Sequence, residues 1–351
     1  MSAHVTIGNR AVGGDAPPFV VAEIGANHDG DVAVAHQSID AFADTGVDAV
    51  KFQTYCAEEL VADGDRVLRW GPPGAEREEP IGAMFDRIAL PRSAHAELFD
   101  HARERGILAF STPFSIDGVA FLADLDVPAI KLASSDLGYL QLIEAAAKTG
   151  IPTILSTGKS TLGEIDAAVS AFRNAGGTDL VVLHCVAVYP APIEEMNLRT
   201  IPALAAMFPD VVMGLSDHTL DNTAAIASVA LGAAMIEKHA TISRDRVGPD
   251  HWMSNEPPVF AELVRALHDA HVALGTANKH VTVSEVAERT VSTRSIVIAH
   301  PVPAGHRLCA DDLKVVRPGT GIHPHRLDDV VGRSVRHALG ANHVLQWEDL
   351  A

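Results

Sequence analysis

Short apolar runs alternate with longer amphipathic segments along most of the chain. The runs have the length of strands and cover residues 19–24, 49–52, 107–110, 129–132, 152–155, 180–183, 211–215 and 235–236. The segments between them repeat apolar residues every three or four positions, which is typical of one face of a helix. Eight strands alternating with helices over about 260 residues predict an α/β fold of the (β/α)8 TIM-barrel type, with a doubly wound sheet as the alternative.

Two stretches depart from this alternation. Near the start, Val5-Thr6-Ile7 followed by Gly13-Gly14 predicts a lead-in hairpin that turns at those two glycines. After the second strand, the connection from Tyr55 to about Pro91 is much longer than the others. Loops of this length are commonly lids over a site or mobile surface segments, and we expect one of the two here.

The pattern changes again after the last predicted helix, which covers residues 258–274. Residues 276–292 are expected to be a partly helical linker, and residues 293–351 a small β-rich domain punctuated by glycine and proline. The barrel would then occupy residues 1–275. A domain of about 60 residues buries little surface alone, so we expect it to dock on another subunit.

Composition narrows the range of functions. The net charge of −18 argues against a nucleic-acid partner, and it lies entirely in residues 1–279 because residues 280–351 hold eight basic and eight acidic side chains. No apolar run approaches the ~18 residues of a membrane span, and the N-terminus lacks a signal-peptide pattern, so no membrane association and a cytoplasmic location are expected. The widely spaced Cys56, Cys185 and Cys309 argue against a disulfide framework or a thiolate zinc site.

Two of the apolar runs switch abruptly to side chains that can bind a metal. Residues 214–218 end in Ser216-Asp217-His218, and residues 235–239 end in Glu237-Lys238-His239, with one helix-length segment between them. A single histidine is more often structural than a ligand. Equivalent positions on consecutive barrel strands would bring both imidazoles to the same rim, which favours one shared metal ion.

The other predicted strand ends carry lysines and small hydroxyl side chains. Lys51 and Lys131 follow the second and fourth strands, and serines and threonines follow most of the others. Ammonium and hydroxyl groups together predict a site for phosphate and carboxylate, although each lysine could instead form a salt bridge with Glu23 or Glu237. Asp250 and Asp136 could bind hydroxyl groups of a polyol or exchange protons. Cys185 is expected to be a buried strand residue rather than a nucleophile.

The ordered set of motifs resembles the sialic acid synthase family over nearly the whole chain. The motifs are AEIGANHDG (22–30), VKFQTY (50–55), STPF (111–114), IKLASSD (130–136), ILSTG (154–158), LHCxxxYPAP (183–192), GLSDHT (214–219), EKHAT (237–241), GPDH (248–251) and RPGTGI (317–322). The resemblance implies a barrel followed by an antifreeze-like (SAF) domain. It also implies a domain-swapped homodimer in which the small domain caps the partner subunit's active site.

The resemblance further implies an activity. Members of that family condense phosphoenolpyruvate with an N-acylated amino-hexose, such as N-acetylmannosamine or a relative. The products are a nine-carbon 2-keto sugar acid, or nonulosonic acid, and phosphate. The reaction would depend on a divalent metal, usually Mn²⁺, with Mg²⁺ or Co²⁺ as alternatives.

Residue roles follow from the same resemblance, position by position. His218 and His239 would bind the metal, and Glu23 would lie beside the reacting centre, where we hypothesise that it handles the protons of the attacking water. Phosphoenolpyruvate would be held by Lys51, Thr112, Lys131, Ser134, Ser156 and Ser216. The sugar would be bound by Gln53, Asp136, Tyr189 and Asp250, and by Arg317 from the partner subunit.

Three features depart from the family pattern. Ala187 stands where the family usually has asparagine or serine, Lys159 stands where methionine usually follows the STG motif, and residues 61–85 lack the expected amide-containing pattern. The acceptor pocket is therefore expected to be altered while the core chemistry is retained. Two alternatives stay open: a Schiff-base aldolase that uses Lys131 or Lys51, and a non-catalytic sugar-binding relative.

Overall fold

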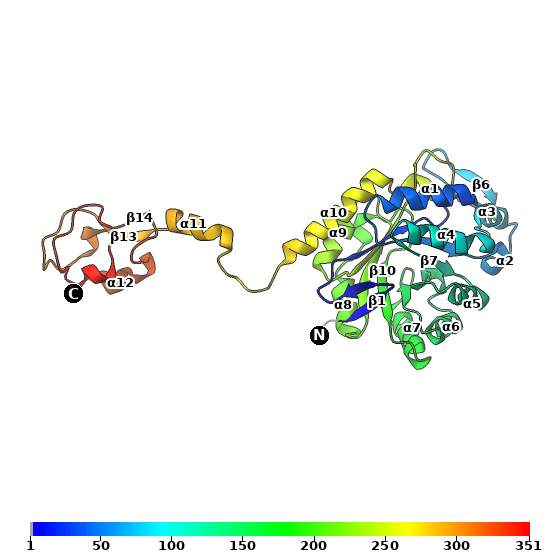
Figure 1. The fold of residues 1–351 in the computed structure, drawn as a ribbon, viewed down its shortest axis with the longest axis horizontal. Coiled ribbons are helices and arrows are strands. Elements are labelled where there is room, and N and C mark those ends of the chain that lie inside the picture. Colours follow the sequence, from blue (N-terminus) through cyan, green and yellow to red (C-terminus); the bar gives the residue numbers. More distant parts are fainter. Residues whose placement is uncertain (1–2) are drawn as a thin grey trace. The chain divides into compact units, whose positions relative to one another are not determined.

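The computed structural model describes residues 3–351. The chain forms two compact units, the first ending at Gly275 and the second beginning at Thr276 (Figure 1). The first unit contains the barrel, and the second contains a helix and a small β-rich fold with a core of its own.

Eight parallel strands close into a barrel in the first unit. In chain order they are β3 (Phe19–Glu23), β4 (Ala49–Thr54), β7 (Leu108–Pro113), β8 (Ile130–Leu132), β9 (Thr153–Ser156), β10 (Leu180–Cys185), β11 (Val212–Asp217) and β12 (Met235–His239). Each strand pairs with the next along the chain, and β12 pairs in parallel with β3 to complete the circle. The predicted (β/α)8 barrel is confirmed, and closure rules out the doubly wound sheet.

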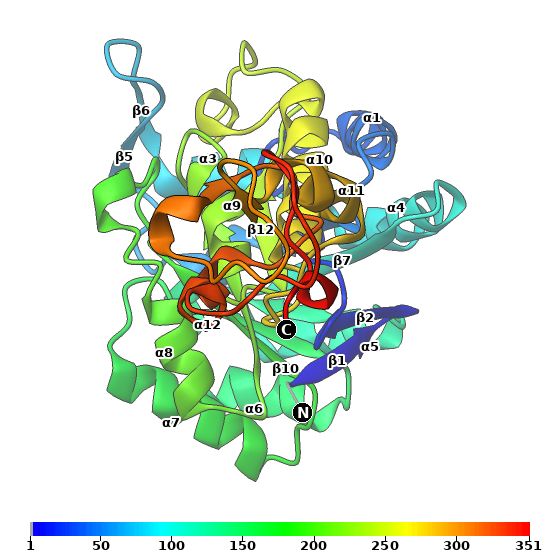
Figure 2. The ribbon, with the colours of Figure 1, turned by 90° about the vertical axis from the view of Figure 1, so that its left-hand side faces the viewer.

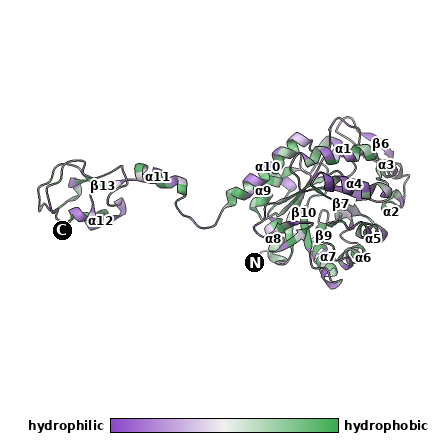
Figure 3. Cartoon of the chain, in the orientation of Figure 1, coloured by the Kyte–Doolittle hydropathy of each residue, from purple (hydrophilic) through white to green (hydrophobic). Residues whose placement is uncertain are grey.

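Helices cover the outside of the barrel. They are α1 (Val32–Ala43), α4 (Arg92–Glu104), α5 (Ile116–Asp124), α6 (Leu140–Lys148), α7 (Leu162–Asn174), α8 (Thr200–Met207), α9 (Thr223–Ala230) and α10 (Pro257–Leu274). Their apolar faces pack against the strands, whereas their outer faces are largely hydrophilic (Figure 3). Side-chain caps begin several of them: Asp31 accepts from Ala33 N, and Thr161 accepts from Glu164 N.

An N-terminal hairpin closes the end of the barrel opposite the predicted site. Its strands are β1 (His4–Ile7) and β2 (Arg10–Gly13), and its buried Val5, Ile7 and Val12 join the apolar side chains inside the barrel. The predicted turn was misplaced, because the chain reverses at Gly8-Asn9 rather than at the two later glycines. Gly8 has a φ of 59°, the left-handed conformation that two-residue hairpin turns require.

The long connection after β4 is structured. It contains α2 (Ala57–Leu60), the hairpin strands β5 (Val67–Trp70) and β6 (Arg77–Pro80), and α3 (Ile81–Ile88). The hairpin projects beyond the helices of the barrel unit (Figure 2). A small separate core of Ala26, Met84 and Ile88 holds α3 against the mouth of the barrel, so this segment is a folded addition rather than a simple loop.

The second unit contains α11 (Val283–Ser292), the antiparallel strands β13 (Ser295–Ile298) and β14 (Leu313–Val316), and α12 (Leu327–Val330). Ten buried apolar side chains, among them Ile296, Leu308 and Leu345, form its core. The predicted small β-rich domain is therefore confirmed. Between residues 3 and 351, no helix has both the length and the apolar character needed to cross a membrane.

This small fold contains an internal duplication that was not predicted from the sequence. In each half, the carboxylate of one aspartate lies within 3.1 Å of the Nε2 atoms of two histidines and accepts a hydrogen bond from a backbone N–H group: His300, His306 and Cys309 N around Asp312, and His337, His343 and Gln346 N around Asp349. Val302 and Leu339 exchange reciprocal backbone hydrogen bonds of 2.9 Å at the centre of the two halves. The two halves are thus related by a local two-fold axis.

Candidate active site

A polar cavity of about 180 Å³ lies at the C-terminal ends of the barrel strands. It is smaller than the roughly 300–1,000 Å³ of sites for drug-sized ligands, which suits a small, highly charged molecule. The predicted site residues that line it are Glu23, Lys51, Gln53, Thr112, Lys131, Ser134, Ser156, Tyr189, Ser216, His218, His239 and Asp250. Residues from all eight strands or the loops that follow them therefore meet at one mouth.

Strand alternation decides which polar side chains face this cavity. Glu237 and His239 lie two positions apart on β12 and both line it. The intervening Lys238 does not, and its Nζ donates to Asp217 Oδ2 at 2.7 Å and to two backbone carbonyl oxygens. Lys238 is therefore a structural lysine outside the barrel interior, although it belongs to the same strand end.

Two lysines and two glutamates form the charged centre of the cavity. The ammonium of Lys51 is paired with Glu23 and donates to Thr112 Oγ1 at 2.9 Å. Lys131 Nζ lies 3.2 Å from Glu237 Oε1. All four charged side chains are buried, so the alternating charges are only weakly screened by water. The salt bridges expected as an alternative for the lysines are thus present, and they lie in the same cavity as the hydroxyl side chains.

The two glutamates have opposite proton affinities. Burial raises the pKa of Glu23, although the neighbouring Lys51 opposes the shift. Burial alone would also raise the pKa of Glu237, but Lys131 and Lys51 outweigh it and lower this pKa to about 2. Gln53 Nε2 donates to Glu23 Oε1 at 3.0 Å and fixes the orientation of that carboxyl group. Glu23 is therefore the carboxyl group suited to proton exchange, and Glu237 is a permanent anion.

His218 and His239 face each other across the cavity, with 5.3 Å between their ring centroids. Nδ1 of His218 lies 2.9 Å from the carbonyl oxygen of Val186, which leaves Nε2 available as a ligand. Nδ1 of His239 is buried without a hydrogen-bond partner among the described residues. Burial lowers the pKa of His239 well below its usual value, so this imidazole is neutral, as metal ligation requires.

These two histidines could hold a divalent metal ion once His218 is deprotonated, because burial alone would lower its pKa but the contact with Cys185 raises it. Within residues 3–351 no group of three or more histidine, cysteine, aspartate or glutamate side chains is arranged around one point. An ion here would rest on the two imidazoles, one protein ligand fewer than catalytic zinc sites usually have, and would take its other ligands from substrate or water.

Tyr189 and Asp250 adjoin the histidine pair. The ring of Tyr189 lies 4.3 Å from that of His218 and 5.7 Å from that of His239, between centroids. Asp250 Oδ2 is 3.6 Å from His239 Nδ1. Burial raises the pKa of Asp250 to about 6, so this carboxyl group can donate or accept a hydrogen bond near neutral pH.

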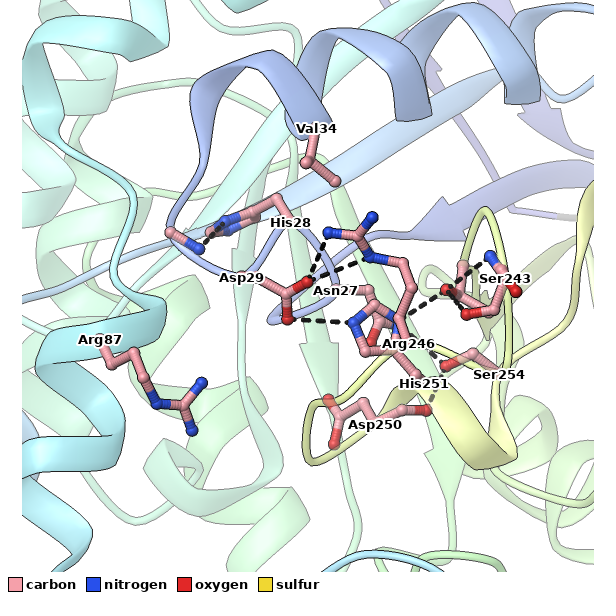
Figure 4. Close-up of polar contacts among 12 residues, drawn as sticks. Asn27, His28, Asp29, Val34, Arg87, Ser243, Arg246, Asp250, His251 and Ser254 are labelled. Carbon is pink, nitrogen blue, oxygen red and sulfur yellow. Dashed lines mark hydrogen bonds and ion pairs between the residues drawn. The ribbon is translucent and has the colours of Figure 1, made fainter.

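A hydrogen-bond network outside the cavity holds Asp250 in place (Figure 4). Asp29, in the loop after β3, accepts from Arg246 Nη2 at 2.8 Å and lies 3.0 Å from His251 Nε2. Ser254 Oγ donates to the backbone oxygen of Asp250 at 2.6 Å. These contacts join the loop after β12 to the loop after β3, so the backbone that carries Asp250 is fixed from both sides.

Two predicted site residues do not line the cavity. Asp136 is half-buried in the short 3-10 helix Ser134–Asp136, and only Ser134 and Ser135 of that helix reach the cavity. Arg317 follows β14 in the second unit and is exposed. Its predicted role from the partner subunit stays a prediction.

Sequence reasoning did not assign Glu237 to the site. The available signal was the two-residue spacing between Glu237 and His239, which places both on the inner face of one strand. Lys159, which departs from the family pattern, also lines the cavity. Cys185 is buried as expected, and its Sγ lies 3.7 Å from His218 Nδ1.

A closed (β/α)8 barrel with buried lysines, hydroxyl groups and two facing histidines at its C-terminal mouth defines a barrel enzyme for an anionic substrate. The sequence of residues 38–279 matches the protein-family model of the NeuB family. Residues 293–351 match that of the SAF domain. The chain belongs to the NeuB family. The resemblance to sialic acid synthases and the SAF assignment are both confirmed.

Three synthases of sialic-acid-like sugars are similar to most of this chain. The pseudaminic acid synthase of Helicobacter pylori is 33% identical, covering 95% of this chain and 98% of that protein. The N,N'-diacetyllegionaminic acid synthase of Legionella pneumophila is 32% identical, and the match covers 97% of this chain and 99% of that protein. The crystal structure of the N-acetylneuraminic acid synthetase of Leptospira borgpetersenii is 33% identical with a TM-score of 0.75, covering 82% of this chain and 95% of that one.

Proposed function

We propose that this protein condenses phosphoenolpyruvate with the aldehyde of an N-acylated amino-hexose, yielding a nonulosonic 2-keto acid and phosphate. The observation that carries the proposal is the meeting of two buried lysines, several hydroxyl groups and a histidine pair in one cavity. Family membership supports it, because the relatives described above are synthases of pseudaminic, diacetyllegionaminic and N-acetylneuraminic acids.

The deep part of the cavity suits phosphoenolpyruvate. Lys51 and Lys131 supply positive charge, and Thr112, already bonded to Lys51, can turn toward a carboxylate. Ser156 Oγ is buried without a partner among the described residues, so a bound oxyanion would satisfy it. Ser134 and Ser216 complete the set of small hydroxyl groups around the same space.

The outer part of the cavity suits the sugar. Gln53, Tyr189 and Asp250 line it, and each offers hydrogen-bonding groups for hydroxyl or amide substituents. An N-acetylmannosamine-like acceptor is the class that we propose. The similarity to an N,N'-diacetyllegionaminic acid synthase makes 2,4-diacylamino hexoses worth testing beside it.

The chemistry joins C3 of phosphoenolpyruvate to the aldehyde carbon. Water adds at C2, and the resulting tetrahedral intermediate releases phosphate by cleavage of the C–O bond. Glu23 is the proposed acceptor of the water's proton, because it is buried beside Lys51 and has a raised pKa. Lys51 and Lys131 hold the phosphate and carboxylate oxygens during these steps.

His218 and His239 are the proposed metal ligands. A bound divalent ion would polarise the aldehyde oxygen as a Lewis acid, and Mn²⁺ is proposed ahead of Mg²⁺ or Co²⁺. The imidazoles are oriented by Val186 and by the Tyr189 ring, so they would hold the ion beside the sugar aldehyde.

Phosphate release is the decisive assay. The protein is incubated with phosphoenolpyruvate, Mn²⁺ and a panel of 2-acylamino and 2,4-diacylamino hexoses. We expect release with at least one acceptor, loss of release with a chelator, and recovery when Mn²⁺ is added back. No release with any acceptor and any of the three metals would overturn the proposal.

The Schiff-base alternative has a separate signature. Burial lowers the pKa of Lys131, although Glu237 opposes the shift, and a lysine of lowered pKa can act as a nucleophile. If the protein were such an aldolase, borohydride would trap pyruvate covalently on Lys131 without added metal. We expect no such adduct, because Lys131 is ion-paired with Glu237 within the anion site.

A further inference from the structure

A third lysine, Lys159, lines the cavity, and the chemistry above does not use it. It follows β9 in the turn that leads to α7. Its side chain is exposed, and it makes no hydrogen bond or ion pair with any residue from 3 to 351. A lysine at the mouth of an anion site without a protein partner is available to a ligand.

The backbone of Lys159 is unusual. It has a φ of 65°, in the left-handed region that side chains rarely adopt. The other non-glycine residues of the described chain with positive φ are all aspartate or asparagine, which tolerate this region: Asp29, Asp126, Asn197 and Asn342. Lysine has no such compensation, and residues held in sparsely populated conformations are concentrated at ligand sites.

Neighbouring contacts fix this turn against the inner serines. The N–H group of Gly158 donates to Ser134 Oγ at 2.9 Å, and Thr157 Oγ1 donates to the carbonyl oxygen of Leu183 at 3.0 Å. A Cβ atom on Gly158 would lie only 2.6 Å from Ala187 Cβ, so the turn is packed closely on β10 and its loop. Ala187 itself offers no polar group to a ligand there.

The charge balance of the cavity indicates what Lys159 would bind. Lys51 and Lys131 are matched by the anions Glu23 and Glu237. Phosphoenolpyruvate brings both a phosphate and a carboxylate into this balanced centre. Lys159 is the lysine in the lining that has no carboxylate partner, and a flexible ammonium group can reach phosphate as a point charge.

We propose that Lys159 binds the phosphate group of phosphoenolpyruvate, supplying from the β9–α7 turn the polar contact that Ala187 does not provide. This assignment rests on the proposed function. It makes Lys159 a substrate-binding residue of this chain and explains why a lysine occupies a left-handed backbone position beside Ser134.

Calorimetric titration with phosphoenolpyruvate, in the absence of any acceptor, tests the assignment. Lys159→Met should weaken binding by about tenfold or more, because a hydrogen bond to a charged group is lost. Lys159→Arg should retain most of the affinity. Lys148→Met, which removes an exposed lysine of α6 paired only with Glu144, is the matched control and should bind as the wild type does.

Lys159→Gly separates binding from folding. Glycine adopts the left-handed conformation freely, so this variant should have a melting temperature equal to or above that of the wild type and yet bind phosphoenolpyruvate as weakly as Lys159→Met does. Unchanged phosphoenolpyruvate affinity in Lys159→Met and Lys159→Gly would overturn the role of Lys159. A change confined to the KM of the sugar would overturn it as well. A wild-type protein that does not bind phosphoenolpyruvate would instead overturn the proposed function.

Discussion

Glu23 and Glu237 face the same two lysines from neighbouring strands, yet burial raises the pKa of one and the lysines lower the pKa of the other. Paired carboxyl groups whose pKa values are pushed apart commonly divide the work of proton exchange and charge stabilisation. Glu23 can therefore change its protonation during turnover. Glu237 keeps Lys131 and Ser216 in position through contacts of 3.2 Å and 3.1 Å.

Replacing Glu23 with glutamine tests this division. The amide keeps the size of the side chain but cannot take a proton, so Glu23→Gln should lower kcat by about 10²–10⁴-fold. Phosphoenolpyruvate affinity, measured by calorimetry, should stay within a few-fold of the wild type. Full turnover in this variant would show that another group handles the proton.

His28 is a buried histidine that should make stability depend on pH. Its Nδ1 accepts from Gly30 N at 3.0 Å, and burial lowers its pKa to about 4. The unfolded chain binds this proton near pH 6.5, so stability is full above that pH and is lost as the pH falls toward 4, by up to roughly 3 kcal/mol. Urea unfolding between pH 7.5 and 4 measures the loss.

His28→Gln should remove part of that pH dependence. His95 and His184 also have pKa values lowered by burial, so a smaller slope should remain. His280→Gln, at an exposed position of the second unit, is the control and should leave the slope unchanged. An identical slope in all three proteins would contradict the role of His28.

Most of the site was predictable because its residues follow apolar runs of strand length. Lys51, Lys131 and His239 are the clearest cases, since each lies at the end of a run that the barrel places at one rim. Asp136 lies outside the cavity lining because the chain turns into a 3-10 helix directly after β8, and this local geometry leaves no periodic signal. Glu237 was not predicted, because a salt bridge between it and a lysine was considered an alternative to a binding site. In the structure, Glu237 pairs with Lys131 inside the cavity.

At the scale of elements, the regular barrel was predictable and the additions were not. The strands and helices carry period-two and period-3.6 patterns, whereas the β5–β6 hairpin consists of mostly exposed residues with little apolar signal. The duplication in the SAF domain was missed for another reason. Its halves share few identical residues apart from histidines, aspartates and leucines, so the relation becomes plain only through equivalent contacts.

The duplicated aspartates should stabilise the small domain. Each accepts a hydrogen bond from a backbone N–H group and lies beside two imidazoles, and hydrogen bonds to charged groups contribute about 1.5–3 kcal/mol. Asp312→Asn and Asp349→Asn should each speed amide hydrogen exchange across residues 293–351 in the full-length protein. Asp311→Asn, at the exposed neighbouring position, should not, and equal exchange in all variants would contradict the assignment.

At the scale of the whole molecule, we propose a homodimer in which Arg317 completes the sugar site of the partner subunit. Lys131→Met should inactivate the barrel, and Arg317→Ala should raise the KM of the sugar. In an equal mixture of the two variants, about half of the dimers would contain one of each. Each of these would have one site with an intact barrel and an intact Arg317, so activity should recover to about a quarter of the wild type. No recovery on mixing would show that each chain completes its own site.

The central claim is the condensation itself, with phosphate leaving by C–O cleavage. Phosphoenolpyruvate labelled with ¹⁸O in the bridging position tests it directly, with the released phosphate and the sugar acid analysed by mass spectrometry. We expect the label to leave with phosphate, with one phosphate released for each nonulosonic acid formed. Label retained in the organic product, or phosphate released without a new nine-carbon acid, would contradict it.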